Sequence, residues 1–171
     1  MPHRLTAATD RPQLPSKAIR PLAFALVAIA PLAFALFARP LHAQTTPCSL
    51  VTPAEVQALL GAGIPAGTGN RASCRWGQVT KGHALIVLTY ANLPPQAMAG
   101  MRSGMAQDGE AAMDEPTVGT GAASVLTSFG VVVIAPKAGR LVQLQYHVGH
   151  AGSTADRDAV RALAKSVVGR F

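Results

Sequence analysis

The sequence lacks the local motifs of several large enzyme classes. Neither G-x-S-x-G nor H-E-x-x-H occurs in its 171 residues, and no phosphate-binding glycine loop or dinucleotide-binding fingerprint is present. The segment VGTGAAS (residues 118–124) has two glycines but not the G-x-G-x-x-G pattern, so it reads better as a turn before a strand. We therefore predict no catalytic residue and no cofactor from the sequence.

One serine, one histidine and one aspartate do lie close together near the C-terminus. Ser153, His150 and Asp156 are the residue types of a hydrolytic triad, but triads are recognised by geometry and no spacing rule joins these three. We predict structural roles instead, with Ser153 as a helix cap and Asp156 as a carboxylate in the first helical turn. A small periplasmic hydrolase is kept as the alternative among enzymes.

Acidic residues are scarce, and this gives the whole chain a net charge of +7. Five of the 15 basic residues and one of the 8 acidic residues lie before Gln44, which leaves +3 for residues 44–171. A nucleic-acid-binding domain requires basic residues clustered on one face, and no such cluster is visible in the sequence. We therefore expect no nucleic-acid partner.

The first 43 residues have the three parts of a secretory signal peptide. A basic leader precedes residues 21–38, which carry no charge, and the small residue Ala43 precedes the expected cleavage point. Because 18 apolar residues approach the length of a membrane span, and because Leu41 is large for its position, an uncleaved anchor is the alternative. Either way we predict that residues 44–171 form a single exported domain, periplasmic or secreted.

Only two cysteines are present, Cys48 and Cys74, and no histidine lies between them. Their spacing of 26 positions does not match a metal site, and the sequence QTTP before Cys48 lacks the small apolar approach to a lipidated cysteine. In an exported domain such a pair most simply forms a disulfide. A reactive thiol, for which no local partner is seen, remains the alternative.

The remaining patterns predict an α+β domain. Thr52 and Glu55 form a capping box at the start of a two-turn helix that ends at Gly61. The predicted order is α-β-β-α-β-β-β-α, with a mostly antiparallel sheet of about five strands and the helices packed on one face. The later elements are a helix near 95–106, strands near 122–127, 129–135 and 141–148, and a C-terminal amphipathic helix.

Alternation in the last strand separates a dry face from a wet face. Gln143, Gln145 and His147 point to the wet face, and we predict a binding surface there or in the acidic, glycine-containing loop Gln107–Gly121. Copper binding is a further alternative, since methionine and histidine can bind Cu(I) in exported proteins. We expect the methionines to pack on the dry face instead, away from the histidines; the candidate ligands are Met98, Met101, Met105, Met113, His147 and His150.

Four segments of the sequence belong together: PCSLVTPAEVQALLG, CRW, VGTGAAS and ALAKSVV. They resemble a family of small bacterial cell-envelope domains of unknown function, many of them lipoproteins, and the likeness covers most of residues 48–171. This chain departs from the family by lacking the lipoprotein cysteine. The resemblance implies an extracytoplasmic domain with paired cysteines and a binding role, and it supplies no catalytic residues.

We therefore predict a non-catalytic binding or interaction module of the cell envelope. Its partner is expected to be an envelope protein, another envelope component or a small ligand, none of which the sequence identifies. Contact with the membrane is expected only through the N-terminal segment, if that segment is not cleaved.

Overall fold

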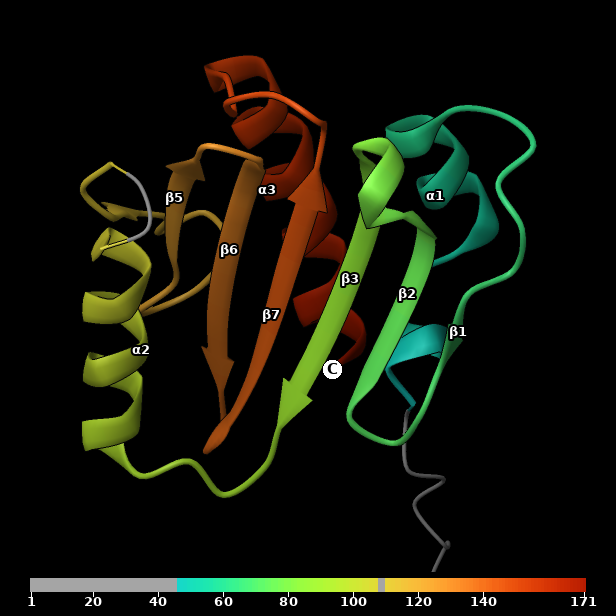
Figure 1. Cartoon of the computed structure of the whole chain (residues 1–171). Helices are drawn as coiled ribbons and strands as arrows, with labels where there is room; N and C mark the ends of the chain where they lie inside the picture. Colours follow the sequence, from blue (N-terminus) through green and yellow to red (C-terminus); the bar gives the residue numbers. More distant parts are fainter. Residues whose placement is uncertain (1–45, 108–109) are drawn as a thin grey trace, which may run out of the picture. The chain divides into compact units, whose positions relative to one another are not determined.

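A seven-stranded antiparallel sheet forms the frame of the domain (Figure 1). The computed structural model describes residues 46–107 and 110–171, so the predicted signal peptide (residues 1–43) lies outside the described residues. The strand order is β1-β2-β3-β7-β6-β5-β4, and every neighbouring pair is antiparallel. The strands are β1 Thr68–Gly69, β2 Ser73–Gln78, β3 His83–Tyr90, β4 Met113–Asp114, β5 Ala123–Thr127, β6 Gly130–Lys137 and β7 Arg140–His147.

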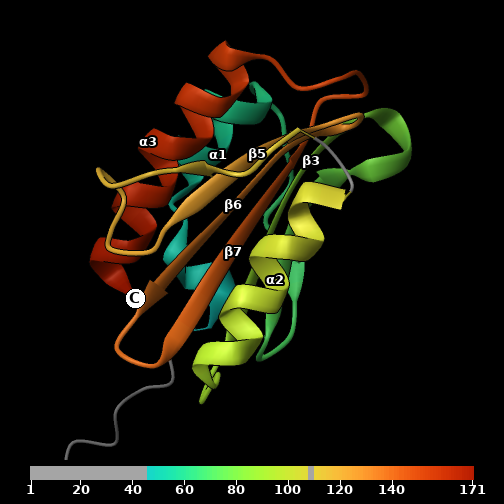
Figure 2. The same ribbon diagram turned by 90° about the vertical axis from the view of Figure 1, so that its left-hand side faces the viewer.

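Three α-helices cover this sheet from two sides. Helices α1 (Pro53–Leu60) and α3 (Thr154–Arg170) lie on one side, and α2 (Pro95–Gln107) lies on the other (Figure 2). We call the side of α1 and α3 the back face and the side of α2 the front face. Two short 3₁₀ turns, η2 (Pro47–Leu50) and η3 (Val79–Lys81), complete the described elements. Among these helices none is both long and apolar enough to cross a membrane.

The α+β class predicted from the sequence is confirmed, but two details are wrong. The sheet has seven strands rather than about five, because one further strand of two residues, β1 or β4, lies at each edge. Segments this short carry no alternation that a sequence pattern could reveal. The helices also do not share one face, since α2 packs its Met105 with Val125 and Val132 on the front face. The apolar side of an amphipathic helix does not indicate which face of a sheet it will cover.

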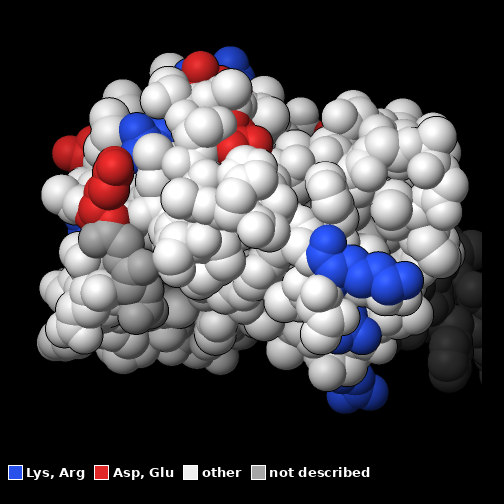
Figure 3. Space-filling model, turned by 45° about the horizontal axis from the view of Figure 1, so that its top comes forward, with Lys and Arg blue, Asp and Glu red and all other residues white. Residues whose placement is uncertain are grey.

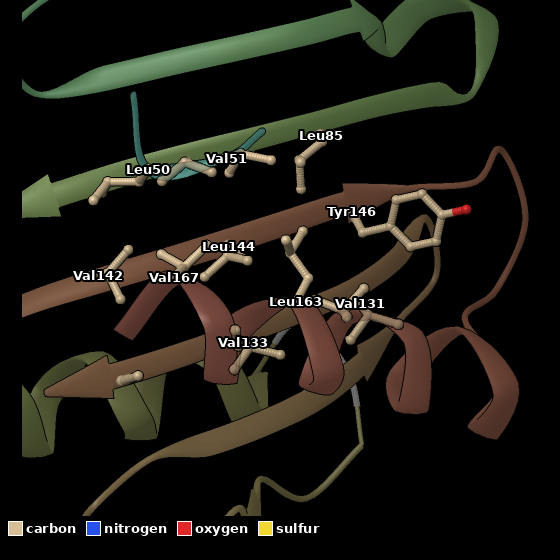
Figure 4. Packing of buried hydrophobic residues seen from close by; sticks show 14 of the residues in the cluster. Leu50, Val51, Leu85, Val131, Val133, Val142, Leu144, Tyr146, Leu163 and Val167 are labelled. Carbon is tan, nitrogen blue, oxygen red and sulfur yellow. The ribbon is translucent and has the colours of Figure 1, made fainter. Parts of the chain in front are cut away.

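The main core fills the space between the back face and α3 (Figure 4). The alternation predicted for β7 is confirmed, because Val142, Leu144 and Tyr146 are buried on this face. Residues from α3 meet them and their neighbours on β3 and β6; the contributors shown include Leu85, Val131, Val133, Leu163 and Val167.

Helix α1 begins at the predicted capping box. The Glu55 backbone N–H donates to Thr52 Oγ1 at 3.3 Å, and the Thr52 N–H donates to Glu55 Oε2 at 2.8 Å. The helix ends at Gly61, whose φ of +87° favours glycine. Near that end, the Tyr146 hydroxyl donates to the Leu59 carbonyl oxygen at 3.0 Å, which fastens α1 to β7. Burial raises the pKa of Tyr146, so the hydroxyl keeps its proton for this bond.

The predicted disulfide between Cys48 and Cys74 is present, with a Cα–Cα distance of 5.0 Å. It joins η2 to β2 beside the buried Trp76. The chain returning from α1 passes over this pair at Gly67, where an added Cβ would lie 2.5 Å from the indole and 2.7 Å from Cys74 Sγ. Only glycine fits there without displacing the ring or the bridge. A disulfide of this kind is consistent with a periplasmic or extracellular location.

An ion pair joins the two ends of the described chain. Arg170 donates to both carboxylate oxygens of Glu55 at 2.8 Å, and its Nη1 also donates to the Leu50 carbonyl oxygen at 2.7 Å. These bonds, together with those from Thr52, outweigh the cost of burial and lower the pKa of Glu55 to about 2. One carboxylate thus caps α1 and holds the last turn of α3.

Removing the disulfide should destabilise the domain. Replacing Cys48 and Cys74 by serine should lower the free energy of unfolding by about 3 kcal/mol, because without the bridge the unfolded chain has a larger conformational entropy. Urea unfolding of wild type and double variant measures the difference. Reductant should produce the same loss in the wild type and none in the variant. Two free thiols in the exported protein, found by non-reducing peptide mapping, would contradict the assignment.

The Glu55–Arg170 pair should make stability depend on pH in the acid range. The folded-state pKa of Glu55, about 2, lies below its ordinary value of 4.5, so its contribution is present above pH 4.5 and is lost as the pH falls toward 2. The shift corresponds to at most about 3 kcal/mol, and we expect about 1–2 because solvent screens the partly exposed Arg170.

Arg170→Gln should reduce that acid-range dependence to the part that the Thr52 bonds maintain, as followed by urea unfolding between pH 2 and pH 6. Lys165→Gln, at an exposed position of the same helix, is the matched control and should keep the wild-type slope. Equal slopes for the wild type and Arg170→Gln would show that the ion pair does not hold the helix ends together.

Candidate binding site

The register of the sheet places two rows of side chains across the front face. Each row crosses from β2 through β3, β7 and β6 to β5, and each changes from polar residues in its middle to apolar residues at β5 and β6. The first row is Arg75, Ile86, Gln145, Val132 and Val125; the second is Ser73, Leu88, Gln143, Ile134 and Ala123.

Helix α2 covers only the apolar end of these rows. Met98, Met101 and Met105 pack over residues of β5 and β6, whereas Ile86 and Leu88 on β3 are half-buried and Arg75 on β2 is exposed. Figure 1 shows α2 beside β5 and β6 and no described helix in front of β2 and β3. The front face is therefore only half covered within the described part of the chain.

Two cavities lie along α2. The larger, about 690 Å³, opens between the first half of α2 and the turn that joins β6 to β7. Its residues on the α2 side are Leu93, Pro95, Met98, Ala99 and Arg102, and those on the sheet side include Ile134, Pro136 and Gly139. The smaller, about 210 Å³, lies between Met101 and Met105 above and Gln143 and Gln145 below. Ile134 lines both cavities, so the two are neighbours under one helix.

The predicted binding residues Gln143, Gln145 and His147 lie on the front face, as alternation indicated, and all three are half-buried. Gln143 Oε1 accepts a hydrogen bond from the Tyr90 hydroxyl at 3.2 Å, and Gln145 borders the smaller cavity. The ring of His147 stacks on Phe129 with 4.7 Å between centroids. Burial lowers the pKa of His147, so its imidazole is neutral near pH 7.

The structure brings together two groups that sequence reasoning separated. The methionines were expected on the dry face, opposite the glutamines, but Met101 and Met105 share a cavity with Gln143 and Gln145. The expectation was wrong because it assumed that every helix covers the same face. This removes the geometric objection to a metal site, although it does not supply one: the described residues hold no cluster of three or more His, Cys, Asp or Glu side chains placed to bind a metal.

The remaining metal candidates lie elsewhere. Met113 is on β4, where its thioether sulfur accepts from Nη1 of Arg157 on α3. His150 is exposed, with its Nδ1 2.8 Å from the Ala151 carbonyl oxygen. Copper binding by the methionine stripe of α2 remains a prediction.

The residues of the considered triad have the structural roles expected for them. Ser153 caps α3, since the Asp156 N–H donates to Ser153 Oγ at 3.2 Å and the Ser153 N–H donates to Asp156 Oδ2 at 2.9 Å. The predicted loop Gln107–Gly121 is not wholly irregular where it is described. It contains β4 and the buried Glu115, whose carboxylate accepts from the Ser124 hydroxyl at 2.6 Å.

Sequence reasoning missed most residues of the larger cavity, although Met98 was a candidate metal ligand and Thr120 and Gly121 belong to the predicted binding loop. Leu93, Arg102 and Pro136 come from two segments that meet only because α2 docks on the front face. One signal was available: Arg102 follows Met98 by four positions, so both lie on one side of α2.

Charged side chains are unevenly distributed on the surface. On the face shown in Figure 3, most Lys and Arg side chains lie toward the side of β1 and β2, and most Asp and Glu side chains lie toward the side of α2 and β5. The open end of the front face, marked by the exposed Arg75, is therefore on the basic side. Of the two side-chain rows, the first has a charged residue, Arg75, at its open end.

No protein-family model matches the chain, and no curated protein or solved structure matches it either. The family resemblance suggested by the sequence segments therefore stays a prediction, and the site has to be interpreted from its own residues.

Proposed function

We propose that the protein is an exported, non-catalytic binding domain of the cell envelope whose ligand lies between α2 and the front face of the sheet. The observation that carries the proposal is the large cavity beside α2. Its volume of about 690 Å³ lies within the range of small-ligand sites, and its lining is mainly apolar with a few polar groups, as such sites generally are.

The packing of α2 supports this role. Met105 is the only one of its thirteen residues that is buried, whereas five residues of α3 are buried against the back face. A helix fastened by so little apolar surface can move at small cost. Methionine side chains are unbranched and flexible, so Met98, Met101 and Met105 can adapt to a ligand beneath them.

Export is the second part of the proposal. It is supported by the N-terminal leader pattern and by the disulfide Cys48–Cys74, since such bridges persist in oxidising compartments. A non-catalytic role is supported by the capping functions of Ser153 and Asp156, which occupy the groups that a triad would need.

Filling the large cavity should abolish ligand capture. Ala99 lines the cavity, and Ala99→Trp places an indole in it; Ala106→Trp is the matched control, at an exposed position of the same helix outside both cavities. Protein purified after export is immobilised and exposed to an envelope extract, and retained proteins and small molecules are identified by mass spectrometry. We expect one component to be retained by the wild type and Ala106→Trp and at least about tenfold less by Ala99→Trp.

Equal recovery by all three proteins, or none above bare resin, would overturn the proposed site. Two further measurements address the alternatives. Turnover in a panel of hydrolase substrates would contradict the non-catalytic role, and Cu(I) binding tighter than about micromolar in a titration would favour the metal alternative instead.

A further inference from the structure

The two cavities under α2 are neighbours along the helix, and we call the pair the track. Met98 borders the larger cavity, Met101 and Met105 border the smaller, and Ile134 lies where they meet. The three methionines are spaced by three and four positions, so they form a single stripe parallel to the helix axis. A ligand that contacts the whole stripe must therefore be elongated.

The track is lined mainly by apolar side chains. Beside Met98 and Ile134 the larger cavity is bordered by Leu93 and Pro136. Its hydrogen-bonding side chains are few: Arg102 and Thr120 border the larger cavity, and Gln143 and Gln145 border the smaller. A sugar or nucleotide needs polar partners along its whole length, whereas a single alkyl chain needs none between its ends.

Arg102 is the cation available in the larger cavity. Two other basic residues border the larger cavity, but both head groups bind the end of α3: Lys137 Nζ donates to the Val168 carbonyl oxygen at 2.7 Å, and the Arg140 guanidinium lies 3.9 Å from the centre of the Phe171 ring. Their positions in β6 and β7 alternate with those of front-face residues, which directs them to the back face.

The present partner of Arg102 is easily exchanged. Arg102 Nη2 lies 2.5 Å from Asp114 Oδ1, but the Asp114 side chain is 74 % exposed and that of Arg102 is 39 % exposed. Ion pairs between side chains this exposed contribute little to stability. A ligand carboxylate could replace Asp114 and accept both guanidinium N–H groups.

We propose that the track binds a single-chain anionic amphiphile of the fatty-acid class, with its alkyl chain beneath α2 and its carboxylate on Arg102. This rests on the proposed function and names its ligand chemistry. Affinity should rise with chain length, since each additional methylene group is removed from water under the methionines. No bond is made or broken in this binding step.

Methionine methyl NMR tests the location. Dodecanoate, kept below the concentration at which it forms micelles, is titrated into the purified protein labelled with ¹³C at the methionine methyl groups. Met98, Met101 and Met105 should shift together and saturate, and Met113, which lies outside both cavities beside Asp114, should shift by less. Octanoate should bind severalfold more weakly than dodecanoate.

Two variants test the head group. Arg102→Gln should weaken dodecanoate binding by about tenfold or more, because a charge-assisted contact is lost, and should leave binding of uncharged dodecanol within about twofold. Lys137→Gln, whose charged group binds the end of α3 on the back face, should leave both affinities unchanged. Thermal unfolding followed by circular dichroism establishes that each variant is folded.

Several outcomes would overturn the inference: no shift at the three α2 methyls, an equal shift at Met113, or equal losses for dodecanoate and dodecanol in Arg102→Gln. A lysophospholipid that binds while dodecanoate does not would also overturn the fatty-acid class. If Ala99→Trp still abolishes capture of an envelope component, the proposed function stands without this ligand. If Ala99→Trp has no effect on capture, the proposed function itself fails.

Discussion

The width of the back face is the constraint on which the rest of the structure depends. A single helix, α3, lies against β6, β7 and β5, so η2 and α1 have to cover the side of β2 and β3. These are short elements that would not persist without tertiary contacts. The Cys48–Cys74 bridge, the Arg170–Glu55 pair and the bond from Tyr146 to Leu59 hold them in place. Closure of the back face thus relies on a few specific links in addition to apolar burial.

The front face is built differently, and the difference locates the proposed function. One lightly buried helix covers half of it, and two cavities lie under that helix. Within the described part of the chain no covalent bond links α2 to the strands, and its ion pair joins Arg102 to the exposed Asp114 on β4. A rigid back layer can keep the sheet in register while α2 adjusts. Binding sites are commonly formed where a stable scaffold carries a less stable element.

Local chemistry was predictable from the sequence, and the pairing of distant segments was not. The Thr52–Glu55 box, the Ser153 cap and the alternation of β7 each depend on residues a few positions apart, so sequence patterns identify them. The Cys48–Cys74 bridge followed because only one pairing exists. The choice of face for α2 depends on its fit to Val125, Val132 and Ile134, which no local pattern encodes. The cavities depend on that choice, and they could not be predicted for the same reason.

The central claim is that α2 can open while the sheet beneath it stays folded. Native-state hydrogen exchange tests it most directly, because it reports the free energy of opening at each amide. The account predicts that amides of α2, such as those of Met101 and Met105, open at least about 2 kcal/mol more easily than those of Val133 on β6 and Val160 on α3. Protection of α2 equal to that of β6 and α3 would show that the helix opens only with global unfolding, and would contradict the account.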